Sequence, residues 1–262
     1  MATPLEPSPW VTAGVPGMLS IVIPARNELP NLRPTITALA TTLNEARIAY
    51  EIIVVDDHSD DGTAAELAAL ERDIPTLRHI ENLNTAGYGL AVRAGLEAFR
   101  GDRVAIVMAD GSDDPVDVLR FHRKIDEGYD CVFGTRFARG STLVDYPPHK
   151  LVLNRFANLF IKFLFRLKVN DVTNAFKCYR REVIAGVQPI LAHHFNLTVE
   201  LPLKAIIRGY SYVEVPNAWY NRKAGLSKLR IREMGSRYLF IILYCLIERY
   251  LSRGDYHRER PQ

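Results

Sequence analysis

Hydrophobic and polar positions alternate along the first half of the chain in a strand–helix rhythm. Apolar runs that end in polar or glycine-rich segments occupy residues 19–24, 51–55, 104–108 and 131–133. Apolar residues spaced by three and four, the period of an amphipathic helix, lie between them over 29–47, 63–72, 87–99 and 115–127. Such repetition predicts right-handed crossovers and a mostly parallel sheet with helices on both faces. We therefore expect an α/β, Rossmann-like fold.

The pattern changes after Pro147 and Pro148, where a long helix is predicted over 149–168. This segment is rich in Leu and Phe, and its polar residues form a narrow stripe of Arg155, Asn158, Lys162 and Arg166. A helix of this kind is either a core helix or lies in a membrane interface. Both interpretations remain open from the sequence.

The remaining elements are shorter, except for a last helix from about residue 232. We expect strands over 171–183 and 210–216, with a helix near 197–208 between them. The unbroken apolar run 238–247 in the last helix is too short to span a bilayer. Docking in a membrane interface or packing against a second copy is the expected role, so a homo-oligomer is possible.

These patterns divide the chain into three expected segments. Residues 1–17 are rich in Pro and Gly and form an expected disordered lead-in. Residues 18–231 form the expected catalytic domain, including the membrane-facing helix at about 149–168. Residues 232–262 form a C-terminal apolar helix and a polar tail.

Composition narrows the class of partner. The net charge of +3 is too small to indicate nucleic acid, but Lys and Arg gather beside apolar residues in the second half, as at an anionic membrane surface. The three cysteines, Cys131, Cys178 and Cys245, are odd in number and widely spaced, which predicts buried reduced thiols in a cytosolic protein.

Carboxylates cluster where two predicted strands end. Asp56 and Asp57 follow the second strand, and Asp110, Asp113 and Asp114 follow the third. Ligands of open α/β sheets bind beyond the carboxyl ends of the strands. Asp56 and Asp57 suit a nucleobase, ribose hydroxyls or a metal. Asp110 and Asp113 suit Mg²⁺ or Mn²⁺, which takes its other ligands from phosphate and water, whereas capping of the next helix explains one residue of the Asp113–Asp114 pair.

These segments resemble the family-2 inverting glycosyltransferases of the GT-A fold. The motifs that bear the resemblance are IVIPARNE at 21–28, IIVVDDHSDDGT at 52–63, the Asp-rich turn and FGTRF at 133–137. DVTNAFKCYRREV at 171–183 and NRKAGLSKL at 221–229 resemble, more narrowly, the dolichyl- and polyprenyl-phosphate sugar synthases, such as dolichol-phosphate mannose synthases.

The resemblance implies a role for each matching position. Pro24, Arg26, Glu28 and Asp57 would line the nucleoside pocket, together with Asp56 beside them. Asp110 would bind the metal that bridges the donor phosphates, and Arg136 would face those phosphates. Arg222, Ser227 and Lys228 would lie on a loop closing over donor and acceptor. The chain departs from the family at Met108-Ala109-Asp110, where Asp-x-Asp is usual, so Asp113 would supply the missing carboxylate.

The expected activity is transfer of one sugar, mannose or glucose-like, from a GDP- or UDP-sugar to a polyprenyl phosphate, with inversion. The expected location is the cytoplasmic face of a membrane, as a peripheral or monotopic protein. A lipid phosphate needs cations rather than a base, and the second half offers Lys150, Arg155, Lys177, Arg180 and Arg181. One alternative is a family-2 transferase with a hydroxyl acceptor, which needs a base such as Glu200 or Asp171. A degenerate nucleotide-sugar-binding or scaffold protein is the other.

Overall fold

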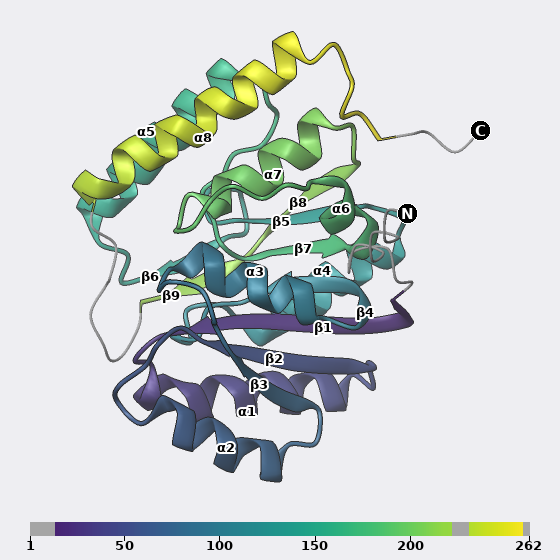
Figure 1. Ribbon diagram of the computed structural model, residues 1–262, viewed down its shortest axis with the longest axis vertical. Helices are drawn as coiled ribbons and strands as arrows, with labels where there is room; N and C mark the ends of the chain where they lie inside the picture. The colour runs from purple at the N-terminus through teal and green to yellow at the C-terminus, as the bar shows by residue number, and fades with distance from the viewer. Residues whose placement is uncertain (1–13, 222–230, 259–262) are drawn as a thin grey trace, which may run out of the picture.

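The computed structural model describes residues 14–221 and 231–258, and within the last helix its side chains from Gly235 onward. A seven-stranded sheet with the order β3-β2-β1-β4-β7-β5-β8 crosses the molecule (Figure 1). Its strands are β1 (Val15–Ala25), β2 (Tyr50–Asp56), β3 (Leu77–Glu81), β4 (Gly101–Ile106), β5 (Cys131–Thr135), β7 (Lys177–Arg180) and β8 (Tyr212–Pro216). β6 (Thr142–Val144) and β9 (Ala218–Tyr220) pair in a small second sheet.

Helices cover both faces of the large sheet. They are α1 (Leu29–Glu45), α2 (Thr63–Asp73), α3 (Tyr88–Ala98), α4 (Pro115–Asp126), α5 (Pro148–Leu164), α6 (Arg181–Gly186), α7 (Leu197–Ile207) and α8 (Ile231–Leu251). One core joins the sheet to α1, α2 and α4. A second core joins the other face to α3, α6 and α7, and the inner side chains of α5 and α8 pack onto it. The predicted α/β class is confirmed.

Alternation along the strands explains the two cores. In β1, Leu19, Ile21 and Ile23 belong to one core, whereas Val22 belongs to the other. A central strand that is buried on both faces appears in the sequence as a continuous apolar run, and this is why β1 could be predicted from the sequence. The three cysteines lie buried and free in the structure, as expected.

Three segments differ from the sequence prediction. The strand expected over 171–183 is wrong in extent, because only Lys177–Arg180 is strand and Arg181 begins α6. β7 runs antiparallel to both β4 and β5. β3 was not predicted, since its sequence Leu-Arg-His-Ile-Glu has no apolar run. β1 begins at Val15, where Val15 N–H donates to the carbonyl of Arg100, so residues 15–17 are not part of a disordered lead-in.

The parallel strands bring the polar loops to one edge. β1 pairs with β2 and β4 in parallel register, and β5 runs in the same direction beyond β7. The loops after β1, β2, β4 and β5 therefore leave the sheet at the same end. This edge contains the predicted site.

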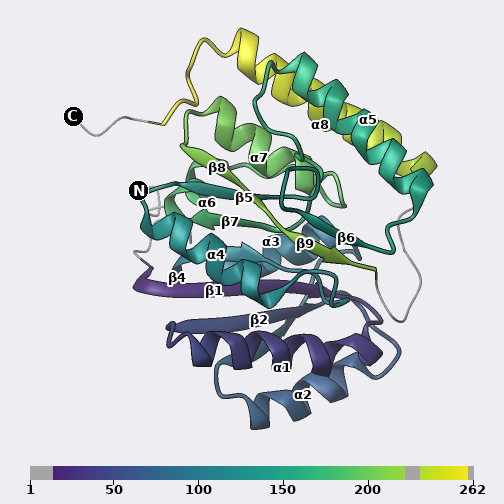
Figure 2. The ribbon, with the colours of Figure 1, turned by 180° about the vertical axis from the view of Figure 1, so that it is seen from behind.

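α5 and α8 lie together outside α7, at the side of the molecule away from α1 and α2 (Figures 1 and 2). Arg249 of α8 donates to the carbonyl of Phe165, just after α5, at 2.5 Å. α8 is held to α7 by a buried ion pair in which Arg208 Nε lies 2.7 Å from Glu248 Oε1. Within the described ranges, no helix is long and apolar enough to cross a membrane.

α7 contains a fully buried ion pair. Lys204 Nζ lies 2.6 Å from Glu200 Oε1, and both side chains are completely inaccessible to solvent. The Glu200 carboxylate also accepts the N–H groups of Leu191 and Ala192. The pair therefore ties the segment before α7 to the helix.

Replacing Glu200 with Gln is expected to lower the free energy of unfolding by about 3–5 kcal/mol, because it leaves the Lys204 ammonium buried without a counter-charge. The matched control is Arg33→Ala, which breaks exposed pairs with Glu66 and Asp73 and should leave the free energy of unfolding nearly unchanged, because solvent screens such pairs. Urea unfolding measures both. Equal costs for the two variants would contradict this role for the Glu200–Lys204 pair.

Candidate active site

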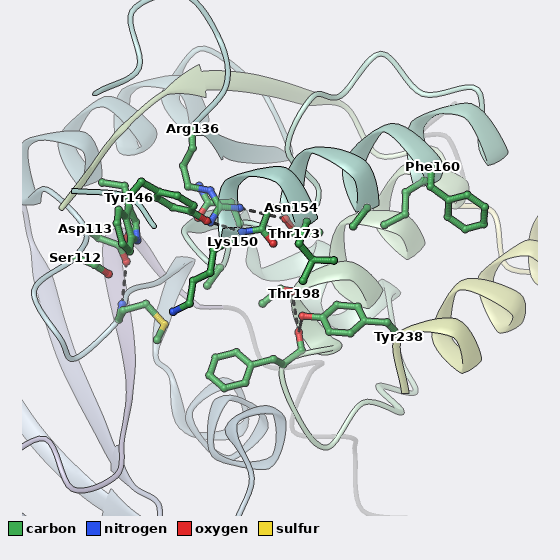
Figure 3. Close-up of a pocket in the computed structure, with 18 of the residues that line it drawn as sticks. Ser112, Asp113, Arg136, Tyr146, Lys150, Asn154, Phe160, Thr173, Thr198 and Tyr238 are labelled. Atoms are coloured by element: carbon green, nitrogen blue, oxygen red, sulfur yellow. Dashed lines mark hydrogen bonds between the residues drawn. The ribbon is translucent and has the colours of Figure 1, made fainter. Parts of the chain in front are cut away.

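A cavity of about 340 Å³ opens at the carboxyl ends of β4 and β5 (Figure 3). One end is polar and charged, and is lined by Asp110, Ser112, Asp113, Arg136, Tyr146 and Lys150. The other end is mostly apolar, and is lined by Leu153, Ala157, Phe160 and Ile161 of α5 and by Tyr238 and Ile242 of α8. The cavity therefore joins the loops of the sheet edge to the space between the two outer helices.

Asp110 and Asp113 face the charged end from the loop after β4. Asp110 Oδ1 accepts Ser112 N–H at 3.1 Å, and Asp113 Oδ2 accepts Met108 N–H at 3.0 Å. Burial, and secondarily the charge of Asp110, raise the pKa of Asp113 to about 7. Two buried carboxylates close to each other repel when both are ionised, so a cation bound beside them is favourable.

Of the pair Asp113–Asp114, it is Asp114 that caps the following helix. It is the N-cap of α4, and its Oδ1 accepts Val116 N–H at 2.9 Å. The described residues contain no cluster of three or more metal-ligating side chains. Two carboxylates nevertheless fit Mg²⁺ or Mn²⁺ when substrate phosphates supply the remaining ligands, so the chemistry of Asp110 and Asp113 suits the expected metal.

Arg136 enters the cavity wall directly after β5 and is paired with Asp171. Its Nε donates to Asp171 Oδ2 at 2.7 Å, its Nη2 to Asp171 Oδ1 at 2.8 Å, and its backbone N–H to the same carboxylate at 3.0 Å. Arg136 Nη1 donates to Tyr146 Oη at 3.2 Å. Although burial alone would favour the neutral acid, the adjacent guanidinium lowers the pKa of Asp171. Both groups are therefore held in their charged forms.

The two carboxylates expected to act as a base for a hydroxyl acceptor do not fit that role. Asp171 is enclosed by Arg136, Asn158 and Thr173. Glu200 is enclosed by Lys204 and two backbone N–H groups. A general base must reach the proton that it removes, so these two assignments are wrong.

The predicted phosphate-binding cations divide into two groups. Lys150 lines the cavity (Figure 3), and Arg155 lies over the ring of Phe137 at 5.1 Å. Three others are wrong as phosphate ligands, because they donate to backbone carbonyls: Lys177 to Val172, Asn174 and Thr198, Arg180 to Ile125 and Tyr129, and Arg181 to Phe99 and Gly101. Burial lowers the pKa of Lys177 to about 7.

The expected nucleoside-binding residues lie at the ends of β1 and β2, beside this cavity but outside its lining as far as the chain is described. Pro24 is buried and Arg26 is exposed, with Glu28 between these extremes. Asp56 Oδ1 accepts Ser59 N–H at 3.1 Å. Asp57 accepts Gly87 N–H at 2.9 Å and Asn82 Nδ2 at 2.7 Å, so it also positions the start of α3.

Three of the predicted site residues, all on the loop expected to close over donor and acceptor, cannot be placed. Arg222, Ser227 and Lys228 lie outside the described residues. Of the other site residues, the structure brings Asp110, Asp113 and Arg136 into one cavity, with the nucleoside candidates on the adjacent strand ends.

Several cavity residues were missed by sequence analysis: Tyr146, Asn154, Thr173, Phe195, Thr198 and Tyr238. One signal was present, since Asn154 and Asn158 stand one turn apart on a helix rich in Leu and Phe. Asn154 Nδ2 donates to Tyr146 Oη, and Asn158 Oδ1 accepts Val172 N–H at 2.7 Å. The others come from distant segments and left no local pattern.

Comparisons with known proteins agree with this geometry. The family model described as glycosyl transferase family 2 matches residues 20–187, more than half of the chain. The polyprenol monophosphomannose synthase of Mycolicibacterium smegmatis is 35% identical over 217 residues, covering 80% of each chain. The dolichol-phosphate mannosyltransferase of Mycosarcoma maydis is 28% identical over 251 residues, covering 94% of this chain and 83% of the relative.

Solved structures show the same fold at low sequence identity. Glucosyl-3-phosphoglycerate synthase from Mycobacterium tuberculosis, in complex with Mn²⁺, UDP-glucose and phosphoglyceric acid, superposes with a TM-score of 0.67 at 17% identity, covering 88% of this chain and 79% of that one. Its complex with Mn²⁺, UDP and glucosyl-3-phosphoglycerate gives a TM-score of 0.65 at 18% identity over the same shares. The GT-A fold is thereby confirmed. The family model and the relative at 35% identity show the enzyme class as well: the chain belongs to glycosyltransferase family 2.

Proposed function

We propose that this protein transfers a mannosyl group from a GDP- or UDP-sugar to a polyprenyl phosphate, with inversion at the anomeric carbon. The observation that supports this function is the two-ended cavity, which has charged groups at the sheet edge and apolar side chains between α5 and α8. A polyprenyl phosphate matches this cavity, because it has a charged phosphate at one end and an apolar isoprenoid chain at the other. The names of the two mannosyltransferase relatives favour mannose and a polyprenol-type acceptor.

The chemistry requires no general base. A phosphate monoester is ionised near neutral pH, so its oxygen can attack the anomeric carbon while the bond to the donor diphosphate breaks. Lys150 would hold the acceptor phosphate, and Arg136 would add positive charge to the same wall. Asp110 and Asp113 would hold Mg²⁺ or Mn²⁺, which neutralises the leaving diphosphate.

The outer helices favour a membrane surface as the site of action. In α5 two residues of the polar stripe face the protein: Asn158 Nδ2 donates to Thr173 Oγ1 at 2.9 Å, and Lys162 Nζ to Asn170 Oδ1 at 2.8 Å. Several apolar side chains face outward, with Phe156 69% and Phe163 83% exposed. α8 adds exposed Leu239, Phe240, Leu243 and Ile247. We assign this surface to the headgroup–acyl boundary of the cytoplasmic leaflet, where such helices bind.

Wild-type protein with Mg²⁺ or Mn²⁺, a panel of GDP- and UDP-sugars and a short polyprenyl phosphate should yield label in the organic phase. Asp110→Ala should lower that transfer by at least about 100-fold, the scale of losing stabilisation of a charged leaving group. The matched control is Asp114→Ala, which removes the cap of α4 and an exposed hydrogen bond from the Tyr220 hydroxyl, and should cost about 1 kcal/mol of stability. Donor binding without any lipid-phase label from wild-type protein would contradict the proposed function.

Lys150→Met should raise the KM for polyprenyl phosphate by about tenfold or more, the scale of one hydrogen bond to a charged group. Donor affinity measured without lipid should not change. Lys168→Met serves as the control, because Lys168 is exposed beyond the end of α5. If Lys150→Met instead weakens donor binding alone, the acceptor phosphate lies elsewhere.

Replacing Phe156 and Phe163 with Glu should abolish co-sedimentation with vesicles that contain anionic lipid, since burying new charges in the acyl boundary is unfavourable. Transfer to a short, detergent-dispersed acceptor should persist. Leu83→Glu is the control, because Leu83 is 89% exposed outside α5 and α8. Retained vesicle binding together with a dimer-to-monomer change would show instead that this surface joins two copies of the chain.

A further inference from the structure

Trp219 adds an aromatic ring to the cavity wall to which the proposed reaction has so far given no role. It stands in the middle of β9, is half-buried, and lines the cavity. Successive side chains of a strand point to opposite sides, and its neighbours Ala218 and Tyr220 do not line the cavity. The side chain of Trp219 therefore faces the cavity, whereas that of Tyr220 faces away from it.

The backbone of Trp219 is tied to the loop that carries the two cavity carboxylates. Trp219 forms an antiparallel bridge with Asp113, and the N–H of the next residue, Tyr220, donates to the carbonyl of Ser112 at 3.0 Å. In the small second sheet, Trp219 is paired in parallel with Leu143 of β6. Trp219 is thus held at the charged end of the cavity, in a fixed place relative to Asp113.

A second aromatic ring restricts the orientation of the indole. The rings of Tyr146 and Trp219 meet edge to face, with centroids 4.5 Å apart and an interplanar angle of 63°. Tyr146 is itself held, because its Oη accepts Arg136 Nη1 at 3.2 Å and also accepts Asn154 Nδ2. Figure 3 shows Tyr146 beside Asp113. The two rings therefore form an aromatic corner at the charged end of the cavity.

The proposed reaction requires the transferred sugar to lie at this end. Its anomeric carbon is bonded to the donor diphosphate and is attacked by the acceptor phosphate, so the sugar ring lies between the two phosphates. The groups suited to those phosphates are all at the charged end: Lys150, Arg136 and a cation held by Asp110 and Asp113. The isoprenoid chain extends instead toward the apolar end, between α5 and α8.

We propose that Trp219 binds the transferred sugar by stacking its indole ring on a C–H face of the hexose. The inference rests on the proposed function. A hexose carries its hydroxyl groups around the rim of the ring, and the C–H groups that it exposes on a face pack on the flat surface of an aromatic ring. An indole offers a large apolar surface and one N–H that can donate to a hydroxyl. Since the configuration of each hydroxyl decides which face is apolar, Trp219 also contributes to the choice of sugar.

Nucleotide-sugar binding measured without lipid tests this role. The probes are GDP-mannose and UDP-glucose, each compared with its nucleoside diphosphate in the presence of Mg²⁺. Trp219→Leu should weaken binding of the nucleotide-sugar that the wild type binds by about three- to tenfold, the scale of losing one aromatic contact. Its affinity for GDP or UDP should stay within about twofold of the wild type, well inside the tenfold that 1.4 kcal/mol represents.

Two variants serve as controls. Trp219→Phe keeps an aromatic ring and should retain most of the affinity for the nucleotide-sugar. Tyr220→Leu changes the next residue of the same strand, which is 38% exposed and outside the cavity lining. It should bind each probe within about twofold of the wild type.

Fluorescence provides a measurement that keeps the Trp219 side chain. The chain contains two tryptophans, so Trp10→Phe leaves Trp219 as the only one. Binding of the nucleotide-sugar should change the emission of Trp219 beyond the change that the nucleoside diphosphate alone produces, because only the sugar contacts the indole. An identical change with both ligands would contradict the inference.

The binding series can also overturn it. Equal loss of affinity for the nucleotide-sugar and its diphosphate in Trp219→Leu would show that Trp219 supports the nucleotide site or the fold. Unchanged donor binding with a raised KM for polyprenyl phosphate would assign the ring to the lipid. Failure of the proposed function is distinct, because the wild type would then bind a nucleotide-sugar yet transfer no label to lipid.

Discussion

The buried pair of Arg136 and Asp171 joins three of the segments that surround the cavity. Arg136 follows β5, Asp171 belongs to the loop before β7, and Asn158 of α5 donates to the Asp171 carboxylate at 3.2 Å. Removing one partner would leave the other charge buried without compensation, which is the costly way to break such a pair. The interaction therefore sets where α5 lies relative to the sheet, and so the width of the cavity.

The antiparallel strand β7 explains how this loop reaches the site. β7 enters the sheet between β4 and β5 from the opposite direction, so the residues that precede it arrive at the edge where the parallel strands end. Lys177, the first residue of β7, donates to the carbonyls of Val172 and Thr198 at 3.0 and 3.2 Å. It thereby holds the loop before β7 against the start of α7. The buried ammonium group of Lys177 therefore links two segments that line the cavity, the loop before β7 and the start of α7.

The charged and apolar ends of the cavity have different supports. At the charged end, Asp110 and Asp113 follow β4 and accept backbone N–H groups, as Asp113 does from Met108, which suits precise placement of reacting groups. The apolar end is made by two helices whose outer surfaces are exposed hydrophobic residues. An apolar surface of this extent continuous with a cavity is typical of a binding surface rather than of a solvated exterior.

The sequence by itself determined the strands that are buried on both faces, the helices between them and the carboxylate-rich edge, because these features depend on local periodicity and on strand direction. It did not determine which side of α5 faces outward. The polar stripe that includes Asn158 and Lys162 was compatible with a core helix or with a helix in a membrane interface, and only the partners at residues 170–171 turn these two side chains inward. The division of roles between Asp113 and Asp114 was likewise decided by the loop geometry that directs one to Met108 and the other to the cap of α4. Such choices depend on contacts between segments far apart in the chain, and no local pattern of residues encodes them.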